Sequence, residues 1–188
     1  MSAEKQERRK QLRERQRTLT QEYRQSAGER ITAHVLVSDL WKQADKVFVY
    51  LSMPSEPDTS VLIWEALRTG KQVFVPKCFE NGRMEAVRIT PDSLMKPSAY
   101  GIPEPVEDTG IADPQMISLV IVPCLSVSAD GVRLGHGKGY YDRWLQRSGA
   151  KTICLCFEQM MEDDIPHDAY DICMMYVTTE QGIRKAGQ

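Results

Sequence analysis

The most apolar segment of the chain, residues 118–128 (SLVIVPCLSVS), constrains the fold more than any other feature. A short run rich in valine, isoleucine and leucine is typical of a strand that is buried on both faces of a sheet. Further strand-like segments alternate with helix-like ones, and this order predicts a mostly parallel sheet with helices on both faces. We therefore expect an α/β fold of one domain and three layers, with this strand near the centre of the sheet.

Apolar periodicity and turn residues predict the remaining elements. Asn81-Gly82 favours a tight hairpin turn, and five prolines between positions 91 and 115 predict an irregular surface excursion. Asp58 or Thr59 is suited to cap the helix that follows them. No internal repeat divides the chain, so residues 1–188 are expected to form one domain. The expected helices cover about residues 3–25, 29–43, 60–68 and 140–146, and the expected strands cover 46–52, 72–78, 84–89, 118–128, 151–157 and 172–178.

The composition is that of a globular protein. Hydrophobic residues make up 41% of the 188 residues and charged residues 27%, which excludes a disordered or collagen-like chain. No apolar run reaches the ~18 residues of a membrane span, and the N-terminus lacks the apolar segment of a secretory signal. The five cysteines, an odd number with no Cys-x-x-Cys pair, predict buried reduced thiols rather than a zinc site. We therefore expect a cytoplasmic protein without a membrane partner.

The charge is unevenly distributed along the chain. Residues 1–30 carry nine Lys or Arg and five Asp or Glu, a net charge of +4, whereas the rest of the chain has a net charge of −6. A basic helix of this kind is a nucleic-acid arm, an anion-binding element or a solvated face. The acidic remainder and the absence of interleaved aromatic residues argue against nucleic acid as a partner.

A glycine-rich loop follows the apolar strand, with alternating glycines at residues 135–139. Glycines let backbone amides approach a ligand closely, and such amides, leading into a helix, favour anion binding. Arg133 and Lys138 add positive charge suited to a polyphosphate, and Asp142 is suited to hold Mg²⁺ beside it. The spacing matches neither the P-loop nor the dinucleotide-binding pattern. Because ligands of open α/β sheets bind at the carboxyl ends of the strands, the loop is also well placed for a ligand.

Residues 133–142 (RLGHGKGYYD), after an apolar strand that ends in Val122-Pro123, resemble without a gap the signature of 5-formyltetrahydrofolate cyclo-ligases, also called methenyltetrahydrofolate synthetases. Residues 9–13 (RKQLR) resemble the Lys-x-x-Leu-Arg element of the family's N-terminal helix, with arginine in the lysine position. Residues 51–59 resemble its substrate loop, and residues 100–105 (YGIPEP) resemble the segment whose aromatic residue packs on the folate. Residues 165–171 resemble its approach to the last strand.

The resemblance implies an ATP- and Mg²⁺-dependent enzyme that converts 5-formyltetrahydrofolate to 5,10-methenyltetrahydrofolate. ADP and phosphate are released, and the formyl oxygen is activated by phosphorylation. The implied substrate is a reduced folate, with or without a polyglutamate tail, and the implied fold is similar to that of sugar-phosphate isomerases and CoA transferases. We expect a monomer whose basic N-terminal helix packs on the α/β core.

The resemblance also assigns roles to individual residues of this chain. The implied catalytic residues are Arg133, Lys138 and Glu56, and the implied metal ligands are Asp142 and Asp171. The implied substrate-binding residues are Leu51, Met53, Glu56, Tyr100 and Tyr141. The implied nucleotide-binding residues are Arg9, Lys10, Arg13, Arg133, Leu134, Gly135, His136, Gly137, Lys138, Gly139, Tyr140 and Tyr141.

One departure from the family pattern leaves alternatives open. Many relatives carry a second Asp four residues after the position of Asp171, where this chain has Met175. A catalytically silent relative that binds nucleotide or folate is therefore one alternative, and a sugar-phosphate isomerase-like enzyme is another. His34 and His167 are expected to be structural, and we assign His136 no proton-transfer role.

Overall fold

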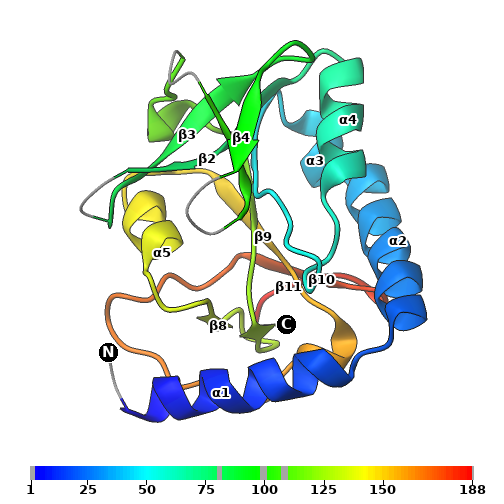
Figure 1. Ribbon diagram of the computed structural model, residues 1–188, viewed down its shortest axis with the longest axis vertical. Coiled ribbons are helices and arrows are strands. Elements are labelled where there is room, and N and C mark those ends of the chain that lie inside the picture. The colour runs from blue at the N-terminus through cyan, green and yellow to red at the C-terminus, as the bar shows by residue number, and fades with distance from the viewer. Residues whose placement is uncertain (1–2, 80–81, 98–100, 107–109, 188) are drawn as a thin grey trace.

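The computed structural model describes residues 3–79, 82–97, 101–106 and 110–187, and Figure 1 shows how its elements are arranged. The helices are α1 (Ala3–Thr18), α2 (Gln21–Val37), α3 (Asp39–Gln43), α4 (Ser60–Arg68) and α5 (Tyr140–Leu145), with 3₁₀ turns at Pro114–Met116 and Glu158–Met160. The strands are β1 (Lys46–Val49), β2 (Gln72–Cys78), β3 (Met84–Ile89), β4 (Met95–Pro97), β5 (Pro103–Pro105), β6 (Leu119–Val122), β7 (Ser126–Val127), β8 (Arg133–Leu134), β9 (Lys151–Leu155), β10 (Tyr176–Thr179) and β11 (Gly182–Lys185).

One large sheet contains strands in the order β11-β10-β9-β6-β1-β2-β3. The inner strands from β10 to β2 run parallel, and β11 and β3 pair antiparallel at the two edges. In the middle strand β6, Val120 lies opposite Phe48 of β1 and Thr152 of β9. The predicted α/β fold, its mostly parallel sheet and the central place of the apolar strand are therefore confirmed. The likeness to the sugar-phosphate isomerase fold stays a prediction.

Helices cover both faces of the sheet (Figure 1). Phe48 of β1 packs against α5, with its ring centroid 4.7 Å from that of Trp144 and 5.8 Å from that of Tyr141. Because side chains alternate along a strand, Val47 and Val49 face the opposite side. On that side α4 packs against β1 and β2, and α2 packs against β10 and β11. The element order thus produces the three layers that it predicts.

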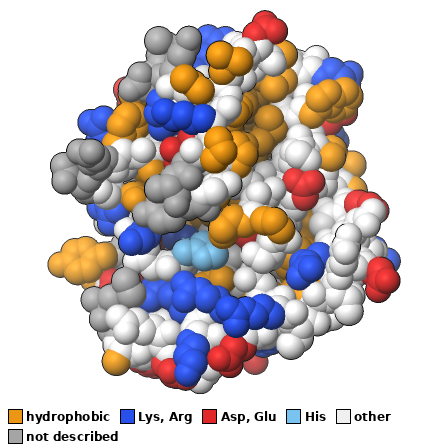
Figure 2. Space-filling view, in the orientation of Figure 1, with side chains coloured by type: hydrophobic (Ala, Val, Ile, Leu, Met, Phe, Trp, Pro, Cys, Tyr) orange, Lys and Arg blue, Asp and Glu red, His pale blue; other side chains and the backbone are white. Residues whose placement is uncertain are grey.

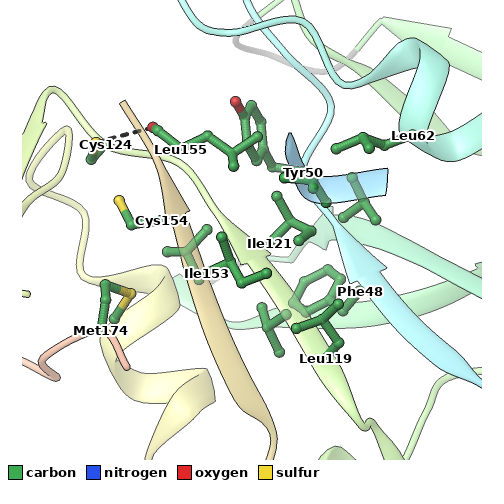
Figure 3. Close-up of a cluster of buried hydrophobic side chains, with 14 of the residues drawn as sticks. Phe48, Tyr50, Leu62, Leu119, Ile121, Cys124, Ile153, Cys154, Leu155 and Met174 are labelled. Carbon is green, nitrogen blue, oxygen red and sulfur yellow. Dashed lines mark hydrogen bonds between the residues drawn. The ribbon is translucent and has the colours of Figure 1, made fainter. Parts of the chain in front are cut away.

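The hydrophobic core lies around the central strands. Leu119 and Ile121 of β6 are fully buried, as are Ile153 and Leu155 of β9 (Figure 3). Full burial of one such side chain contributes about 1.5–3 kcal/mol relative to exposure. The core therefore forms where the sequence is most apolar, and it supports the strand ends that carry the site described below.

The expectations from composition hold where the structure tests them. All five cysteines are free thiols, and Cys124, Cys154 and Cys156 are buried. Figure 3 shows Cys124 beside Leu155, whose carbonyl oxygen accepts a hydrogen bond from Cys124 Sγ at 3.3 Å. Within the described ranges, no helix combines the length and the apolar character that a membrane span needs.

The sequence predicts one basic helix over about residues 3–25 and a second over 29–43. This prediction is wrong, because the structure has three helices in this segment. The backbone of Thr20 is extended, and its side chain accepts a hydrogen bond from Tyr23 N at 3.1 Å. Ser38 likewise accepts one from Trp41 N at 3.2 Å. Hydroxyl caps of this kind satisfy amides at a helix start, so α2 begins at Gln21 and α3 at Asp39.

Four strand predictions are also wrong in their bounds, and two of them only at one end, because β1 ends at Val49 and β9 ends at Leu155. The apolar segment 118–128 does not form one strand, because β6 ends before Pro123 and β7 pairs with β8 in a separate ribbon. Proline lacks the amide hydrogen that a central strand needs, and its carbonyl oxygen here accepts a hydrogen bond from Arg133 Nη1 at 3.2 Å. Near the C-terminus, β10 begins only at Tyr176, and β11 was not predicted. The β7–β8 ribbon places Arg133 beside the carboxyl end of the sheet.

Gly131, in the turn between β7 and β8, carries a first testable prediction. Its φ is +83°, and an added Cβ would lie 2.3 Å from the carbonyl oxygen of Met174. We expect Gly131→Ala to lower the free energy of unfolding by roughly 2–4 kcal/mol, measured by urea denaturation. Gly70→Ala is the matched control, because Gly70 has a φ of +78° but no neighbour within 4 Å of an added Cβ. The control should lose only about 1 kcal/mol, and equal losses would contradict the steric argument.

Candidate active site

A cavity of about 820 Å³ lies at the carboxyl ends of the parallel strands. Its walls come from the segment after β1, the end of β2, Pro123 after β6, and the glycine-rich loop of residues 135–139. Helix α1 crosses this end of the molecule (Figure 1), and Lys and Arg side chains gather on the same face (Figure 2). Ligands of open α/β sheets bind at this end, as the sequence predicts for the loop.

Arginine side chains hold the glycine-rich loop by its carbonyl oxygens. The contacts join Arg9 Nε to Gly135 O at 2.8 Å, Arg13 Nη2 to His136 O at 3.5 Å, and Arg143 Nη2 to Lys138 O at 2.9 Å. In a trans peptide the C=O and N–H groups point in opposite directions, so the amides that follow these carbonyls point away from the arginines. The loop can therefore offer its amides to an anion, in agreement with the prediction from its glycines.

The helix after the loop contributes less than the sequence predicts. Gly139 has a φ of +65° and immediately precedes α5, which spans six residues and ends at Leu145. A helix this short has a weak macrodipole, since the dipole is a sum over aligned peptide units. The predicted anion binding therefore depends on the loop amides and the cationic side chains around them.

Arg133 is the best-anchored cation of the site. Its side chain is only 5% exposed, and its Nη2 donates to Asp142 Oδ1 at 2.7 Å while its Nη1 donates to Pro123 O at 3.2 Å. Burial acts to lower the pKa of Arg133, but the charge and hydrogen bond of Asp142, together with the nearby Cys154 and Cys124, outweigh it and the pKa is raised. The same oxygen of Asp142 accepts a hydrogen bond from Ile172 N at 3.4 Å. Asp142 is thus an ion-pair partner of Arg133, besides being a predicted metal ligand.

The cavity is lined by residues that carry buried donor atoms without a partner among the described residues. These atoms are Arg9 Nη1, Arg133 Nε and Tyr141 Oη. Burial raises the pKa of Tyr141 well above its ordinary value, and the charge of Glu56 adds to this, so the hydroxyl keeps its proton. An unpaired buried donor costs about 1–3 kcal/mol, and native proteins rarely leave one. The arrangement indicates a ligand that accepts hydrogen bonds.

A buried carboxylate lines the same cavity as these donors. Glu56, in the loop after β1, has a side chain that is 3% exposed. Its Oε2 accepts a hydrogen bond from Met53 N at 2.9 Å, and its Oε1 lies 3.0 Å from His136 Nε2. These two contacts hold the carboxylate in one orientation beside Leu51 and Met53, where it can accept hydrogen bonds from a ligand with N–H groups. His136 contacts this carboxylate, although the resemblance assigns it to the nucleotide.

Lys5 links α1 to the segment before β10. Its Nζ pairs with Asp168 Oδ2 at 2.8 Å and with Asp171 Oδ2, and its side chain is 7% exposed. Burial acts to lower the pKa of Lys5, but the hydrogen bonds to Asp168 and Asp171 outweigh it and raise the pKa. Asp171 Oδ2 also accepts a hydrogen bond from Asp168 N at 2.7 Å. One oxygen of the predicted metal ligand Asp171 is therefore already engaged.

Known proteins are similar to this chain in sequence and in fold. The family model described as "5-formyltetrahydrofolate cyclo-ligase family" matches residues 1–180. The chain belongs to this family. A 5-formyltetrahydrofolate cyclo-ligase of Mus musculus is 30% identical and aligns over 87% of each chain, and one of Escherichia coli K12 is 29% identical over 89% of this chain and 96% of the relative. The structure of a 5,10-methenyltetrahydrofolate synthetase from Aquifex aeolicus superposes with a TM-score of 0.87, at 29% identity, over 98% of this chain and 93% of that one.

Most residues that the cyclo-ligase resemblance singles out line the cavity, but two of the described ones are not among its lining residues. Lys10 is exposed and lies outside the cavity lining, so its predicted nucleotide contact is not supported. Arg13 contacts the loop backbone from outside. Tyr100 lies outside the described residues. The predicted site residues that do line the cavity are Arg9, Leu51, Met53, Glu56, Arg133, Leu134, Gly135, His136, Gly137, Lys138, Gly139, Tyr140, Tyr141, Asp142 and Asp171.

Sequence reasoning missed two anchors of the cyclo-ligase site. The buried residues of α1 are Lys5, Arg9, Leu12 and Gln16, and their helical spacing would have pointed to Lys5 as a neighbour of Arg9 on one face. Arg143 directly follows the matched signature. Its contacts depend on the distant hairpin of β2 and β3, so no local signal marks it.

Proposed function

We propose that this chain catalyses the ATP-dependent closure of 5-formyltetrahydrofolate to 5,10-methenyltetrahydrofolate, with release of ADP and phosphate. The observation that carries this proposal is the cavity, which places a buried carboxylate, Glu56, and the unpaired donors of Arg9, Arg133 and Tyr141 around one space. A reduced folate offers ring N–H groups to a carboxylate, and a polyphosphate offers oxygens to cationic donors. Membership of the family supports the same reaction.

Different residues of the chain have different roles in this reaction. The formyl oxygen is a poor leaving group. ATP, when bound, supplies a phosphoryl group to this oxygen, which can then leave as phosphate. Arg9, Arg133 and Lys138 neutralise phosphate charge, which is the main demand that phosphoryl transfer makes on a protein. Glu56 holds the folate ring, with apolar contacts from Leu51 and Met53, so that the formyl group stays near the phosphate site. Tyr141, which keeps its proton, donates a hydrogen bond to an oxygen in the cavity.

The site offers a magnesium ion two predicted carboxylate ligands, which are enough only if substrate phosphates and water complete its coordination. Within the described part of the chain, no group of three or more His, Cys, Asp or Glu residues could hold a metal alone. Mg²⁺ usually takes one or two carboxylates together with substrate phosphates and water. Asp142 and Asp171 would supply these carboxylates beside the phosphates, where the ion would neutralise charge. Chelation of Mg²⁺ is therefore expected to weaken nucleotide use.

The activity test mixes the purified protein with 5-formyltetrahydrofolate, ATP and Mg²⁺ and follows the near-ultraviolet absorbance of the methenyl product. Product that disappears when ATP is omitted or a chelator is added would establish the proposed reaction. ATP binding without product would favour a catalytically silent relative, and turnover of a sugar phosphate without ATP would favour an isomerase-like enzyme. Met175 is exposed and lies outside the cavity lining, so its difference from an acid gives the silent alternative no structural support.

Lys138 should act mainly on the nucleotide. It is exposed and lines the cavity at the glycine-rich loop, so its ammonium acts as a screened point charge. We expect Lys138→Ala to raise the KM for ATP about tenfold and to leave the KM for the folate nearly unchanged. Lys42→Ala, which removes an exposed lysine of α3, is the control for net charge. An equal rise in both Michaelis constants of Lys138→Ala would contradict the assignment.

The setting of the enzyme is also proposed. Five free thiols support a reducing compartment such as the cytoplasm, and a monomer is proposed because the cavity is completed by residues of a single chain. Sedimentation velocity at micromolar concentration tests the monomer. The same activity assay, run with folates of different polyglutamate length, would show whether the tail contributes to binding.

A further inference from the structure

The guanidinium group of Arg143 joins two segments that are far apart in the sequence. Its Nη2 donates to Gly82 O at 2.6 Å and to Lys138 O at 2.9 Å. Gly82 lies at the turn between β2 and β3, and Lys138 lies in the glycine-rich loop. The guanidinium carbon also lies 5.6 Å from the ring centroid of Tyr140. Arg143 therefore fastens the loop to the end of the β2–β3 hairpin at the edge of the sheet.

Glycines on both sides leave room for this guanidinium. An added Cβ at Gly139 would lie 2.8 Å from Arg143 Nη1, and one at Gly82 would lie 3.2 Å from Arg143 Nη2. Both glycines also have positive φ, +65° and +74°, which other residues adopt at a cost. The last glycine of the signature thus serves to admit Arg143, in addition to letting a ligand approach the backbone.

The contact with Lys138 O has a consequence for the next amide. The peptide between Lys138 and Gly139 is planar, so a hydrogen bond that fixes its carbonyl also fixes the direction of Gly139 N–H, on the opposite side. Arg9 fixes the peptide that follows Gly135 in the same manner. A loop whose peptide planes are fixed before binding avoids an entropic cost of ordering when it receives an anion.

We propose that Arg143 is a positioning residue for the nucleotide phosphates, and this rests on the proposed function. Arg143 also lines the cavity, and we assign its effect to orientation of the Gly139 amide, through the carbonyl of Lys138 held beside Gly82, rather than to its charge. Both hydrogen bonds come from one nitrogen, Nη2, whose two N–H directions are fixed by the planar guanidinium group. A compact ammonium on a flexible stem reaches such a pair of carbonyl oxygens poorly.

The test compares Arg143→Ala, Arg143→Lys and Arg147→Ala. Arg147 also lies close after the loop, but its guanidinium pairs with Glu85 at 3.1 and 3.3 Å. For Arg143→Ala we expect the KM for ATP to rise about tenfold, and the KM for the folate to stay within about twofold. Arg143→Lys, which keeps the charge, should recover only a small part of this loss. Arg147→Ala should lower the melting temperature while leaving the KM for ATP unchanged.

Two results would overturn the proposal. Full recovery by Arg143→Lys would mean that only positive charge matters, and an equal loss in Arg147→Ala would mean that general destabilisation is the cause. Titration calorimetry with a non-hydrolysable ATP analogue separates the proposal from the reaction. If the wild type forms no methenyl product, the proposed function fails, whereas weaker analogue binding by Arg143→Ala than by Arg147→Ala would still support the role of Arg143.

Discussion

Arg133→Ala is expected to lower kcat/KM by about two to three orders of magnitude, the largest loss predicted for this chain. Arg133 is almost fully buried, pairs with Asp142 at 2.7 Å, donates to Pro123 O at 3.2 Å, and keeps Nε unpaired at the cavity. Alanine would remove the charge that we propose neutralises phosphate and would leave Asp142 with the long contact from Ile172 N. Because breaking a buried ion pair leaves an uncompensated charge, the variant should also lose about 3–5 kcal/mol of stability.

The two effects of Arg133→Ala can be separated. Thermal unfolding defines a temperature at which the variant is folded, and steady-state kinetics with both substrates are measured below it. Arg133→Lys keeps one positive charge but cannot donate to both Pro123 and Asp142, so it should remain at least about tenfold less active than wild type. Arg68→Ala, which removes an exposed arginine of the Glu65–Arg68 pair on α4, controls for the loss of one guanidinium. If the folded Arg133→Ala variant kept activity within about threefold of wild type, the proposed role of Arg133 at the phosphates would be wrong.

Glu56→Gln is expected to raise the KM for 5-formyltetrahydrofolate about 10- to 100-fold while changing the KM for ATP little. The carboxylate is 3% exposed, accepts a hydrogen bond from Met53 N at 2.9 Å and lies 3.0 Å from His136 Nε2. The amide of glutamine has one acceptor oxygen, so it cannot accept from Met53 and from the folate as the carboxylate does. The near-isosteric change keeps the packing, so the stability loss should be small.

The specificity of the Glu56 effect is the decisive measurement. Initial rates over a grid of both substrate concentrations yield the two Michaelis constants separately. Glu65→Gln, at a carboxylate on α4 that pairs with the exposed Arg68, should leave both constants unchanged. A rise in the KM for ATP equal to that for the folate would place Glu56 at the nucleotide instead. An unchanged folate KM would remove Glu56 from the substrate site.

Local signals explain the predictions that were confirmed. Helix α4 spans Ser60–Arg68 as predicted, because Asp58 accepts hydrogen bonds from Ser60 at its start and Gly70 follows its end with a positive φ. Strands β2 and β3 match their predicted bounds, since alternation and the Asn81-Gly82 signal lie within a few residues of each pairing. The signature over residues 133–142 is contiguous, so its site residues were found together.

Predictions of helix and strand boundaries were wrong where two nearby sequence signals favoured different structures. Helix propensity continues through residues 18–25, yet the hydroxyl of Thr20 starts a new helix by accepting from Tyr23 N. The apolar pattern of residues 118–128 is continuous, yet Pro123 ends the ladder and gives its carbonyl to Arg133. In each case one side-chain or backbone hydrogen bond outweighed a propensity that is weak per residue.

By itself, the sequence of this cyclo-ligase family member determined the α/β class, the central strand, the position of the glycine-rich loop and the reaction that the signature implies. Only the tertiary structure decided which side chains meet: Lys5 with Asp171, His136 with Glu56, and Arg143 with Gly82. These pairs join different elements of the chain, and their contacts depend on how the elements pack around the carboxyl ends of the sheet. Periodicity and propensity report only on neighbours within a few residues, so the partners of these charged groups could not be read before the fold was known.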